Sequence, residues 1–364
     1  MPETIRIGIV GATVTPGGSG WGANAHVPAI KALPTYELFA VCTQHQDTAQ
    51  ASRDAFGAEI GFHNFPKMVA EPGIDLAVVV VRVPGHYDLV MQALQAGKAV
   101  YCEWPLGRNV EEAEQMADLA KQRNLRTAVG LQARSDPSLM YARELIEQGF
   151  VGDILTVNLR SISQAITERG NGRIWQGDRR NGANTLTIAA GHAIDALCFL
   201  AGEFTSVSAN LATKLPTWHN TDTGETMTVD SPDWIAVNGN VDGGADVSFL
   251  VATVPHNPSG NRLEIHGTEG TLVVTGGSLN LGPNKLEGAR GRDALSVMEP
   301  PAKFILAPAE VPAGPPRNVA QAYARFAAAP DAFHPDFAHA AKRHKLIAAM
   351  EQSSAERRTV DVSA

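Results

Sequence analysis

The sequence lacks the features that mark nucleic-acid-binding, membrane and secreted proteins. Its 30 Lys and Arg residues are outnumbered by 38 Asp and Glu residues, which gives a formal net charge of −8. Nucleic acid is bound through clustered positive charge, and the sequence has no run of basic residues, so we expect no nucleic-acid partner. No apolar run approaches the roughly 18 residues of a membrane span. Residues 1–4 lead into a strand-like run without the segments of a signal peptide, so we expect a cytoplasmic protein with no membrane partner.

Cysteine is scarce, and motifs for metal binding or nucleophilic catalysis are missing. Cys42, Cys102 and Cys198 lie far apart, each in apolar sequence, which predicts buried thiols in a reducing compartment. No set of His, Cys and carboxylate residues has metal-ligand spacing, and no G-x-S-x-G or comparable motif occurs. We therefore expect no metal site.

Length and hydrophobic patterning predict two domains. The 364 residues exceed the roughly 250–300 residues at which one hydrophobic core stops growing. In the first part of the chain, apolar runs alternate with helical segments, which is typical of an α/β domain with a doubly wound parallel sheet. We expect strands at residues 5–11, 36–43, 61–65, 76–81 and 126–131, a further strand from residue 100 to a Trp-Pro step, and helices at residues 23–33, 47–56 and 86–96 and after Asn109.

The pattern changes after a helix expected at residues 136–148. Six strands are expected at residues 154–161, 207–211, 234–240, 245–254, 262–266 and 271–274. One long helix at residues 192–200 and two closing helices at 318–328 and 336–353 accompany them. This pattern predicts an α+β domain with a large, mostly antiparallel open sheet. We place the domains at residues 1–134 and 135–364, with the closing helices able to pack back on the first domain.

A glycine-rich loop follows the first strand. It spans residues 12–22 after Gly11 and contains Gly17, Gly18, Gly20 and Gly22. Glycines at this position let backbone N–H groups approach a pyrophosphate at a helix N-terminus. The loop is longer than the simple G-x-G-x-x-G spacing, and a flexible surface loop is the alternative interpretation.

The end of the second strand leaves the choice between NAD and NADP open. An Asp or Glu here would bind a ribose 2′-hydroxyl, but this chain has Thr43, Gln44 and His45. The missing acid removes a repulsion against a 2′-phosphate, yet no adjacent arginine is present to bind one. The residues favour NADP slightly.

Seven motifs give the chain a resemblance to a known superfamily over nearly its whole length. The chain resembles the glucose-fructose oxidoreductase, inositol dehydrogenase and rhizopine-catabolism superfamily (Gfo/Idh/MocA), and within it the Gal80-like branch. The motifs are Gly8-Ile9-Val10-Gly11, Gly20-Trp21-Gly22-Ala23-Asn24-Ala25-His26-Val27-Pro28-Ala29-Ile30, Val83-Pro84-Gly85-His86-Tyr87, Ala93-Leu94-Gln95-Ala96-Gly97-Lys98, Glu103-Trp104-Pro105-Leu106, Gly130-Leu131-Gln132-Ala133-Arg134 and Gly191-His192-Ala193-Ile194-Asp195.

This resemblance implies a Rossmann domain that binds NAD or NADP, followed by a domain whose open sheet often forms an oligomer interface, so we expect a homo-oligomer, a dimer or tetramer. Many family members reversibly oxidise a hydroxyl of a sugar, cyclitol or polyol. The residues expected to bind the cofactor are Gly11, Thr13, Gly20, Trp21, Gly22, Ala23, Thr43, Val81, Val83, Pro84, His86, Glu103, Trp104, Pro105 and Gln132. His26 and Arg134 are further motif-matched candidates for this end of the cleft, with structural packing as the alternative.

Trp104 departs from the family pattern. The usual signature is Glu-Lys-Pro with the lysine in the reaction centre, and here Trp104 stands between Glu103 and Pro105. An indole offers one N–H donor but no charge and no useful titration. The family's simplest mechanism therefore cannot be carried over unchanged.

Two residues of the Gly191–Asp195 motif remain as candidates for catalysis. His192 and Asp195 are three apart and lie on one helix face, so His192 can act as general acid/base while Asp195 orients it or holds a neighbouring hydroxyl. The alternative for His192 is a core or capping role. Arg82 follows the central strand and could supply positive charge, or form a salt bridge at the strand end.

The loop at residues 167–184 combines aromatic and basic residues and suits a sugar face or an anionic group, or else a solvated surface. The residues expected to contact a carbohydrate-like substrate are Trp104, Arg134, Trp175, Arg179 and His192. The sequence thus predicts an NAD(P)-dependent oxidoreductase acting on a sugar, glycoside or polyol. Two alternatives stay open: a non-catalytic Gal80-like regulator that senses the cofactor and binds a protein, and an NAD-assisted lyase or hydrolase that recycles its cofactor.

Overall fold

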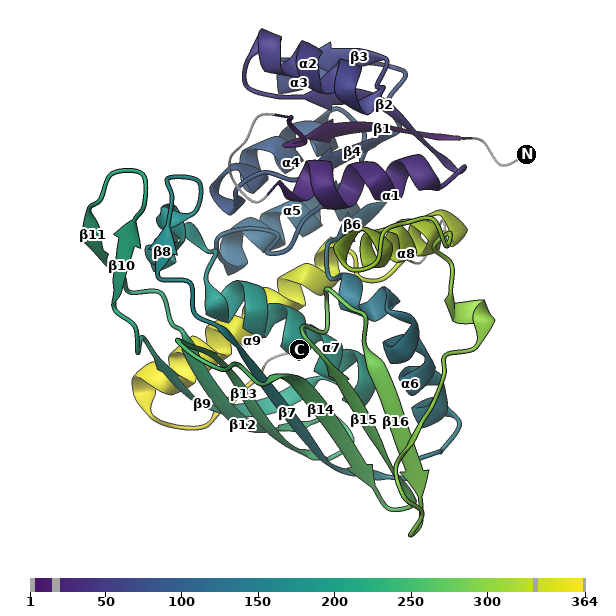
Figure 1. Ribbon diagram of the computed structural model, residues 1–364, viewed down its shortest axis with the longest axis vertical. Coiled ribbons are helices and arrows are strands. Elements are labelled where there is room, and N and C mark those ends of the chain that lie inside the picture. The colour runs from purple at the N-terminus through teal and green to yellow at the C-terminus, as the bar shows by residue number, and fades with distance from the viewer. Residues whose placement is uncertain (1–3, 15–19, 330–332, 363–364) are drawn as a thin grey trace. The chain divides into compact units, whose positions relative to one another are not determined.

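The computed structural model describes residues 4–14, 20–329 and 333–362 (Figure 1). Gly17 and Gly18 of the predicted phosphate loop lie outside these residues. The chain forms two compact units, Met1–Leu131 with Leu306–Ala341 and Gln132–Ile305 with Lys342–Ala364. Among the described residues, no helix combines the length and hydrophobicity that a membrane crossing requires.

The first unit contains a six-stranded sheet in the order β3-β2-β1-β4-β5-β6, and each adjacent pair is parallel. Its strands are β1 (Ile5–Val10), β2 (Tyr36–Cys42), β3 (Ile60–Phe62), β4 (Leu76–Val79), β5 (Ala99–Cys102) and β6 (Thr127–Val129). This order is that of the doubly wound dinucleotide-binding fold, in which ligands bind at the carboxyl ends of the strands where the winding reverses. The predicted α/β class is confirmed, and the reversal falls between β1 and β4.

Helices accompany the strands of this sheet. They are a π-turn η1 (Gly22–His26) continued by α1 (Val27–Ala32), α2 (Gln46–Phe56), α3 (Phe65–Ala70), a 3-10 turn η2 (Val83–Gly85), α4 (His86–Gln95), α5 (Val110–Gln122) and α8 (Pro315–Ala328). Local signals set two of the boundaries: Gly97 has φ +77 after α4, and the Asn109 side chain accepts a hydrogen bond from Glu112 N at the start of α5. α8 contacts both η1 and α1, and its Val319, Tyr323 and Phe326 are buried in the core of this unit.

The second unit is built on a nine-stranded sheet in the order β17-β16-β15-β14-β7-β13-β12-β9-β18. The strands are β7 (Ile154–Gln164), β9 (Phe204–Ala212), β12 (Trp234–Val241), β13 (Asp246–Val254), β14 (Gly260–Gly267), β15 (Gly270–Gly276), β16 (Lys285–Arg290), β17 (Ser296–Val297) and β18 (Val360–Asp361). Only the β7–β13 pair is parallel among these described strands, so the mostly antiparallel sheet is confirmed.

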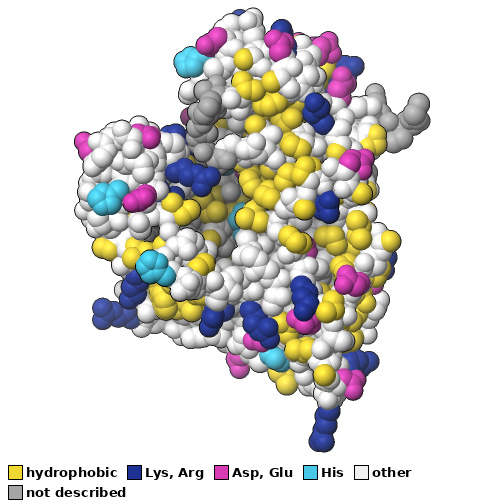
Figure 2. Space-filling model, in the orientation of Figure 1, with side chains coloured by type: hydrophobic (Ala, Val, Ile, Leu, Met, Phe, Trp, Pro, Cys, Tyr) yellow, Lys and Arg dark blue, Asp and Glu magenta, His cyan; other side chains and the backbone are white. Residues whose placement is uncertain are grey.

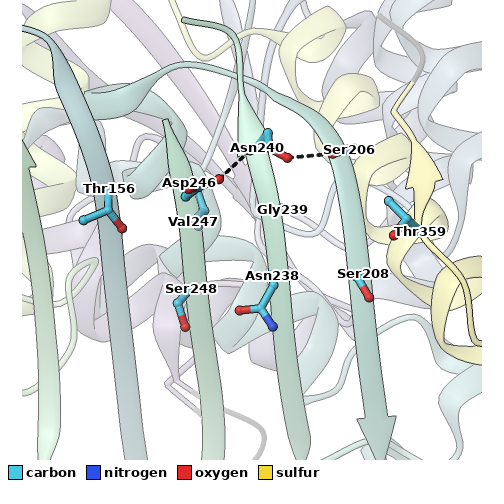
Figure 3. Close-up of a pocket in the computed structure, with 10 residues that line it drawn as sticks. All are labelled: Thr156, Ser206, Ser208, Asn238, Gly239, Asn240, Asp246, Val247, Ser248 and Thr359. Atoms are coloured by element: carbon cyan, nitrogen blue, oxygen red, sulfur yellow. Dashed lines mark hydrogen bonds between the residues drawn. The ribbon is translucent and has the colours of Figure 1, made fainter. Parts of the chain in front are cut away.

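The two faces of this sheet differ. Val157, Leu159 and Phe249 are buried on the face that carries α6 (Pro137–Glu147), α7 (Gly191–Ala201) and the π-turn η6 (Thr185–Ala190). The opposite face presents Ser, Thr and Asn side chains, and Figure 3 shows Asn240 hydrogen-bonded to Asp246 and Ser206 there. This alternation is typical of an antiparallel sheet with one face packed and one face solvated.

The second unit also contains a separate three-stranded sheet, in the order β11-β10-β8. Its strands are β8 (Glu168–Arg169), β10 (Thr217–Asn220) and β11 (Thr226–Thr228). Two 3-10 turns, η4 (Ile174–Gly177) and η5 (Arg179–Asn181), follow β8 along the chain. The remaining elements are η3 (Gln132–Ser135), η7 (Ala302–Phe304) and α9 (Phe337–Glu356), which belongs in part to each unit.

The three cysteines are buried, in agreement with the expectation from their apolar sequence surroundings. On the face drawn in Figure 2, basic and acidic side chains are interspersed rather than gathered by sign. Cys42, Cys102 and Cys198 are all buried free thiols. Burial raises the pKa of Cys42 and of Cys198 to about 12, so neither is a reactive thiolate near neutral pH.

Candidate functional site

Glycine shapes the turn that follows β1. Gly11 has φ +97, and a β-carbon added to it would lie 2.1 Å from the carbonyl oxygen of Val80. A β-carbon on Gly22 would lie 2.9 Å from Cα of Ala12. Neither position therefore has room for a side chain. The backbone at Gly11 lies against Val80, which follows β4, and the backbone at Gly22 in the first helical turn lies against Ala12.

The start of the first helix suits a negatively charged group. Gly20 has φ +64, and its carbonyl oxygen accepts a hydrogen bond from Asn24 N at 2.8 Å. No acidic residue occupies the first turn at Gly22–His26, and this suits an anion near the positive end of the helix. Thr13, Trp21 and Ala23 lie in the same segment. The glycine cradle and this helix start fit the pyrophosphate of a dinucleotide, although residues 15–19 lie outside the described part.

Thr43 closes the turn after β2. Its hydroxyl donates to the carbonyl oxygen of His45 at 3.0 Å and lies 2.7 Å from the hydroxyl of Thr48. Gln44 and His45 are exposed, and no carboxylate occupies this turn. The geometry therefore adds no preference between a ribose 2′-hydroxyl and a 2′-phosphate.

His86 joins the segments that follow β4 and β5. Its Nδ1 lies 2.9 Å from the carbonyl oxygen of Pro105 and its Nε2 lies 3.0 Å from that of Val81. The ring is 1% exposed, and burial lowers its pKa even though the neighbouring carbonyls and Glu103 oppose this shift. His86 was expected to contact the cofactor, and in the structure both of its ring nitrogens face backbone carbonyl oxygens, those of Pro105 and Val81.

Other predicted residues lie on these same two segments. Val83 and Pro84 form η2 after β4, and Arg82 just before them is exposed. Trp104 is only 5% exposed and precedes a cis peptide bond to Pro105. The segments after β1, β2, β4 and β5 thus bring the predicted cofactor residues of the first unit to one edge of its sheet.

Glu103 belongs to a buried hydrogen-bonded group. Its Oε1 lies 3.0 Å from Nε2 of His26, and Nδ1 of His26 lies 2.8 Å from the hydroxyl of Tyr323 on α8. Tyr101 stacks on Tyr323 with ring centroids 5.1 Å apart. A β-carbon on Gly130 would lie 2.5 Å from Glu103 Oε1, so this glycine makes room for the carboxylate. The sequence motifs include His26 and Gly130, but nothing local indicates Tyr323.

Asp195 in the second unit is held by two arginines. Arg134 donates to it from Nε to Oδ2 at 2.8 Å and from Nη2 to Oδ1 at 2.9 Å. Nε of Arg343 lies 3.4 Å from Oδ1, and Asp195 and Arg343 are both fully buried. Burial disfavours the charge on Arg343, but Cys198, Asp195 and Glu203 outweigh it and raise the pKa of this guanidinium. Arg134, expected to contact substrate, is thus engaged with Asp195.

Two further predicted residues flank this pair. His192 lies on α7 one turn before Asp195 and is 6% exposed. Gln132 on η3 is 2% exposed, and neither polar atom of its amide has a hydrogen-bond partner among the described residues. Leaving a buried amide unsatisfied costs about 1–3 kcal/mol, so Gln132 fits a residue that binds a polar group supplied from outside the chain.

The loop residues predicted to contact substrate have other partners. Trp175 Nε1 donates to the carbonyl oxygen of Gly172 at 2.9 Å. Arg179 forms an exposed ion pair of 2.7 Å with Glu351 of α9. Arg169, one of the arginines of the same loop, lines a cavity of about 250 Å³ together with Trp218 of β10. In the described ranges, no group of three or more His, Cys, Asp and Glu side chains is arranged to hold a metal ion.

Comparison with known proteins identifies both parts of the chain. Residues 5–131 match the oxidoreductase family GFO_IDH_MocA with its NAD-binding Rossmann fold, and residues 137–276 match the Gal80p C-terminal domain. The dehydrogenase aclE of Aspergillus oryzae is 34% identical over 77% of this chain and 79% of its own length. The Gal80 regulatory protein of Kluyveromyces lactis is 29% identical over 75% of this chain and 64% of its own length.

Solved structures show the same fold. A levoglucosan dehydrogenase in complex with NADH and L-sorbose superposes with a TM-score of 0.87 and 22% identity, covering 99% of each chain. A super-repressor mutant of Gal80p from Saccharomyces cerevisiae superposes with a TM-score of 0.87 and 22% identity, covering 99% of this chain and 98% of that one. The chain therefore belongs to the GFO/IDH/MocA family of oxidoreductases, in its Gal80-like branch, with NAD or NADP as the cofactor.

Proposed function

We propose that the chain is an NAD(P)-dependent oxidoreductase that acts on a hydroxyl or ketone of a carbohydrate-like substrate, with His192 as the general acid/base. The observation that carries the proposal is that one chain combines the side-chain-free turn at Gly11 with a histidine on a helix fixed by the buried Arg134–Asp195 pair. Relatives named as levoglucosan dehydrogenase and as scyllo-inositol 2-dehydrogenase support a cyclic polyol or sugar substrate.

The proposal assigns proton transfer to this chain's own residues. When bound, the nicotinamide ring accepts or supplies a hydride. The His192 imidazole takes the proton of the substrate hydroxyl during oxidation and returns it during reduction, because an imidazole nitrogen can both accept and donate a proton. Asp195 is a positioning residue, since its carboxylate is engaged with Arg134 and Arg343. Trp104 supplies no proton, so His192 carries this step without the family's usual lysine.

Activity measurements with a matched pair of variants test the proposal. The purified chain is incubated with NAD or NADP and a panel of sugars, glycosides and polyols while absorbance at 340 nm is followed. We expect turnover by the wild type, and a loss of kcat of about 10²–10⁴-fold in His192→Ala with unchanged NADH affinity. His344→Ala, which replaces a second buried histidine of the same unit, is the matched control. An unchanged kcat in His192→Ala contradicts the assignment.

A regulator that binds a protein partner is the second candidate. Trp104 in place of the family's lysine favours it, and so does the similarity to proteins named Gal80. This candidate predicts tight NAD or NADP binding with no turnover on the whole panel. Restoring the family residue discriminates the two: if Trp104→Lys turns over a polyol that the wild type leaves unchanged, the wild type is a non-catalytic member.

A further inference from the structure

The cavity beside Arg169 lies wholly within the second unit and has an unusual charge composition. Its volume is about 250 Å³, and its lining includes Arg169, Arg173, Gln176, Asn184 and Trp218. We call it the Arg169 pocket. It is smaller than the roughly 300–1,000 Å³ of pockets that hold drug-sized ligands, so it has room for one small ring or a short acid.

The Arg169 guanidinium is held in a fixed plane. It stacks over the indole of Trp218 at 4.1 Å from the ring centroid, its Nε donates to the carbonyl oxygen of Ile166 at 2.8 Å, and its Nη1 donates to Oε1 of Gln176. The backbone of Gln176 is held in turn, because the Ser231 hydroxyl donates to its carbonyl oxygen at 2.6 Å. An arginine side chain has five N–H donors, and these contacts use Nε and one N–H of Nη1. The other N–H groups, on Nη1 and Nη2, are held in a fixed orientation and can donate to a further acceptor.

Positive charge in the pocket is not balanced by its own residues. Neither Arg169 nor Arg173 has an ion pair with a carboxylate among the described residues. The one acidic residue of the lining, Asp233, accepts backbone N–H groups of Lys214 and Leu215 at 2.7 Å each. Burial and the charge of Arg173 lower the pKa of Arg169 to about 10. Two guanidinium groups against one carboxylate leave the lining with a net positive charge, and an anion that binds both guanidinium groups would offset it.

We propose that the Arg169 pocket binds the carboxylate of a small sugar acid, in the uronate or aldonate class. A planar carboxylate can accept two parallel hydrogen bonds from an arginine fork, and Gln176 and Asn184 offer amides for sugar hydroxyls. Thr185, Ile188 and Ala189 of η6 line the same pocket, and η6 runs directly into α7, where His192 follows Ile188 by one helical turn. Oxidation of the bound sugar acid rests on the proposed oxidoreductase function, whereas binding of the acid to the pocket does not.

Calorimetry on the full chain tests the proposal without turnover. The probes are D-glucuronate, D-galacturonate and D-gluconate, each compared with a neutral counterpart: the methyl ester for the two uronates and sorbitol for gluconate. We expect at least one acid to bind at least tenfold more tightly than its neutral counterpart. Arg173→Gln, at an exposed position that is not part of any core, should reduce that preference at least tenfold, since charge-assisted hydrogen bonds are the strong ones. Arg180→Gln, which changes the charge equally but removes only the exposed pair with Asp178, should leave it unchanged.

Three results overturn the proposal: no acid exceeds its neutral counterpart, Arg173→Gln keeps the preference, or Arg180→Gln loses it to the same degree. Glucose 6-phosphate is a further probe, and its tighter binding in the absence of any uronate or aldonate binding also overturns the carboxylate assignment. Absorbance at 340 nm separates this proposal from the proposed function. Acid-selective binding with no reduction of NAD or NADP by the acids or by the panel of sugars, glycosides and polyols supports the pocket and contradicts the oxidoreductase, whereas turnover of neutral sugars without acid-selective binding does the reverse.

Discussion

Arg134 and Asp195 form a bidentate ion pair inside the second unit, with N–O distances of 2.8 and 2.9 Å. The pair ties the 3-10 turn η3, which carries Gln132, to α7, which carries His192. Asp195 has no exposed surface. The resemblance to known oxidoreductases predicts that both residues lie near substrate, and their ion pair fixes the two segments that bear the candidate polar groups.

Removing Arg134 should destabilise the protein strongly. Arg134→Met removes both hydrogen bonds that Arg134 donates to the buried carboxylate of Asp195, and breaking one side of a buried ion pair typically costs about 3–5 kcal/mol. Urea denaturation measures the free energy of unfolding. Arg262→Met removes an exposed pair with Glu264 and should cost less than about 1 kcal/mol. Equal costs for the two variants would show that the buried pair contributes no more than a surface pair.

The Tyr323 hydroxyl should matter beyond its own hydrogen bond. In Tyr323→Phe the ring packing is kept, but Nδ1 of the fully buried His26 loses the partner that lies 2.8 Å away. An unsatisfied buried nitrogen costs about 1–3 kcal/mol. We expect a loss of that size in urea denaturation and weaker NADH binding by fluorescence, because His26 holds Glu103. Tyr87→Phe removes a hydroxyl that bonds the exposed Gln115 and is the matched control, for which both quantities should stay near wild type.

Gly11→Ala should abolish dinucleotide binding. The added β-carbon would lie 2.1 Å from the Val80 carbonyl oxygen, and φ is +97. Gly97 has a similar φ of +77 with nothing within 4 Å of an added β-carbon, so Gly97→Ala shares the backbone strain but not the collision. We expect Gly97→Ala to lose about 1 kcal/mol of stability with unchanged NADH affinity. NADH titration and urea denaturation on both variants separate the two effects, and equal NADH affinity in both would argue against the cradle.

Local sequence signals predicted most of the first unit, because its regular elements depend on residues close in the chain. Six apolar runs became six parallel strands, and the ends of α4 and α5 followed from Gly97 and Asn109. The first helix begins with a π-turn at Gly22–His26, which the periodicity did not indicate. In the second unit, β8, β10, β11, β16, β17 and β18 are short and carry polar residues or glycine, so hydrophobic alternation did not reveal them.

Partners distant in sequence account for what was missed in the candidate site. Tyr323 reaches His26 across 297 residues, and Arg343 reaches Cys198 across 145. The composition of the loop at 167–184 indicated that an aromatic residue and an arginine could contact a sugar or an anionic group. It did not show that the arginine is Arg169 and that the ring comes from Trp218 on β10, whereas Trp175 and Arg179 have other partners. Such contacts join segments that are far apart in the sequence, and hydrophobic periodicity does not show which distant segments come together.

His86 should make stability depend on pH in mildly acidic solution. Burial lowers its pKa in the folded chain, whereas an unfolded histidine titrates near 6.5. As the pH falls below about 6.5, the unfolded chain takes up this proton first. The free energy of unfolding that neutral His86 contributes is therefore fully present above that pH. It decreases as the pH falls toward the pKa of His86 in the folded chain, by no more than about 1.4 kcal/mol per pH unit.

Comparison with His86→Gln isolates this contribution. The glutamine can donate to one of the two carbonyl oxygens, of Val81 or Pro105, that lie 3.0 and 2.9 Å from the imidazole, and it does not titrate. Urea denaturation across the range from neutral pH to about one unit below 6.5 gives the slope of unfolding free energy for both proteins. The variant should start lower at neutral pH and show a smaller slope than the wild type. Parallel slopes would mean that His86 does not gain its proton on unfolding, and the carbonyls of Val81 and Pro105 would then hold it as an imidazolium.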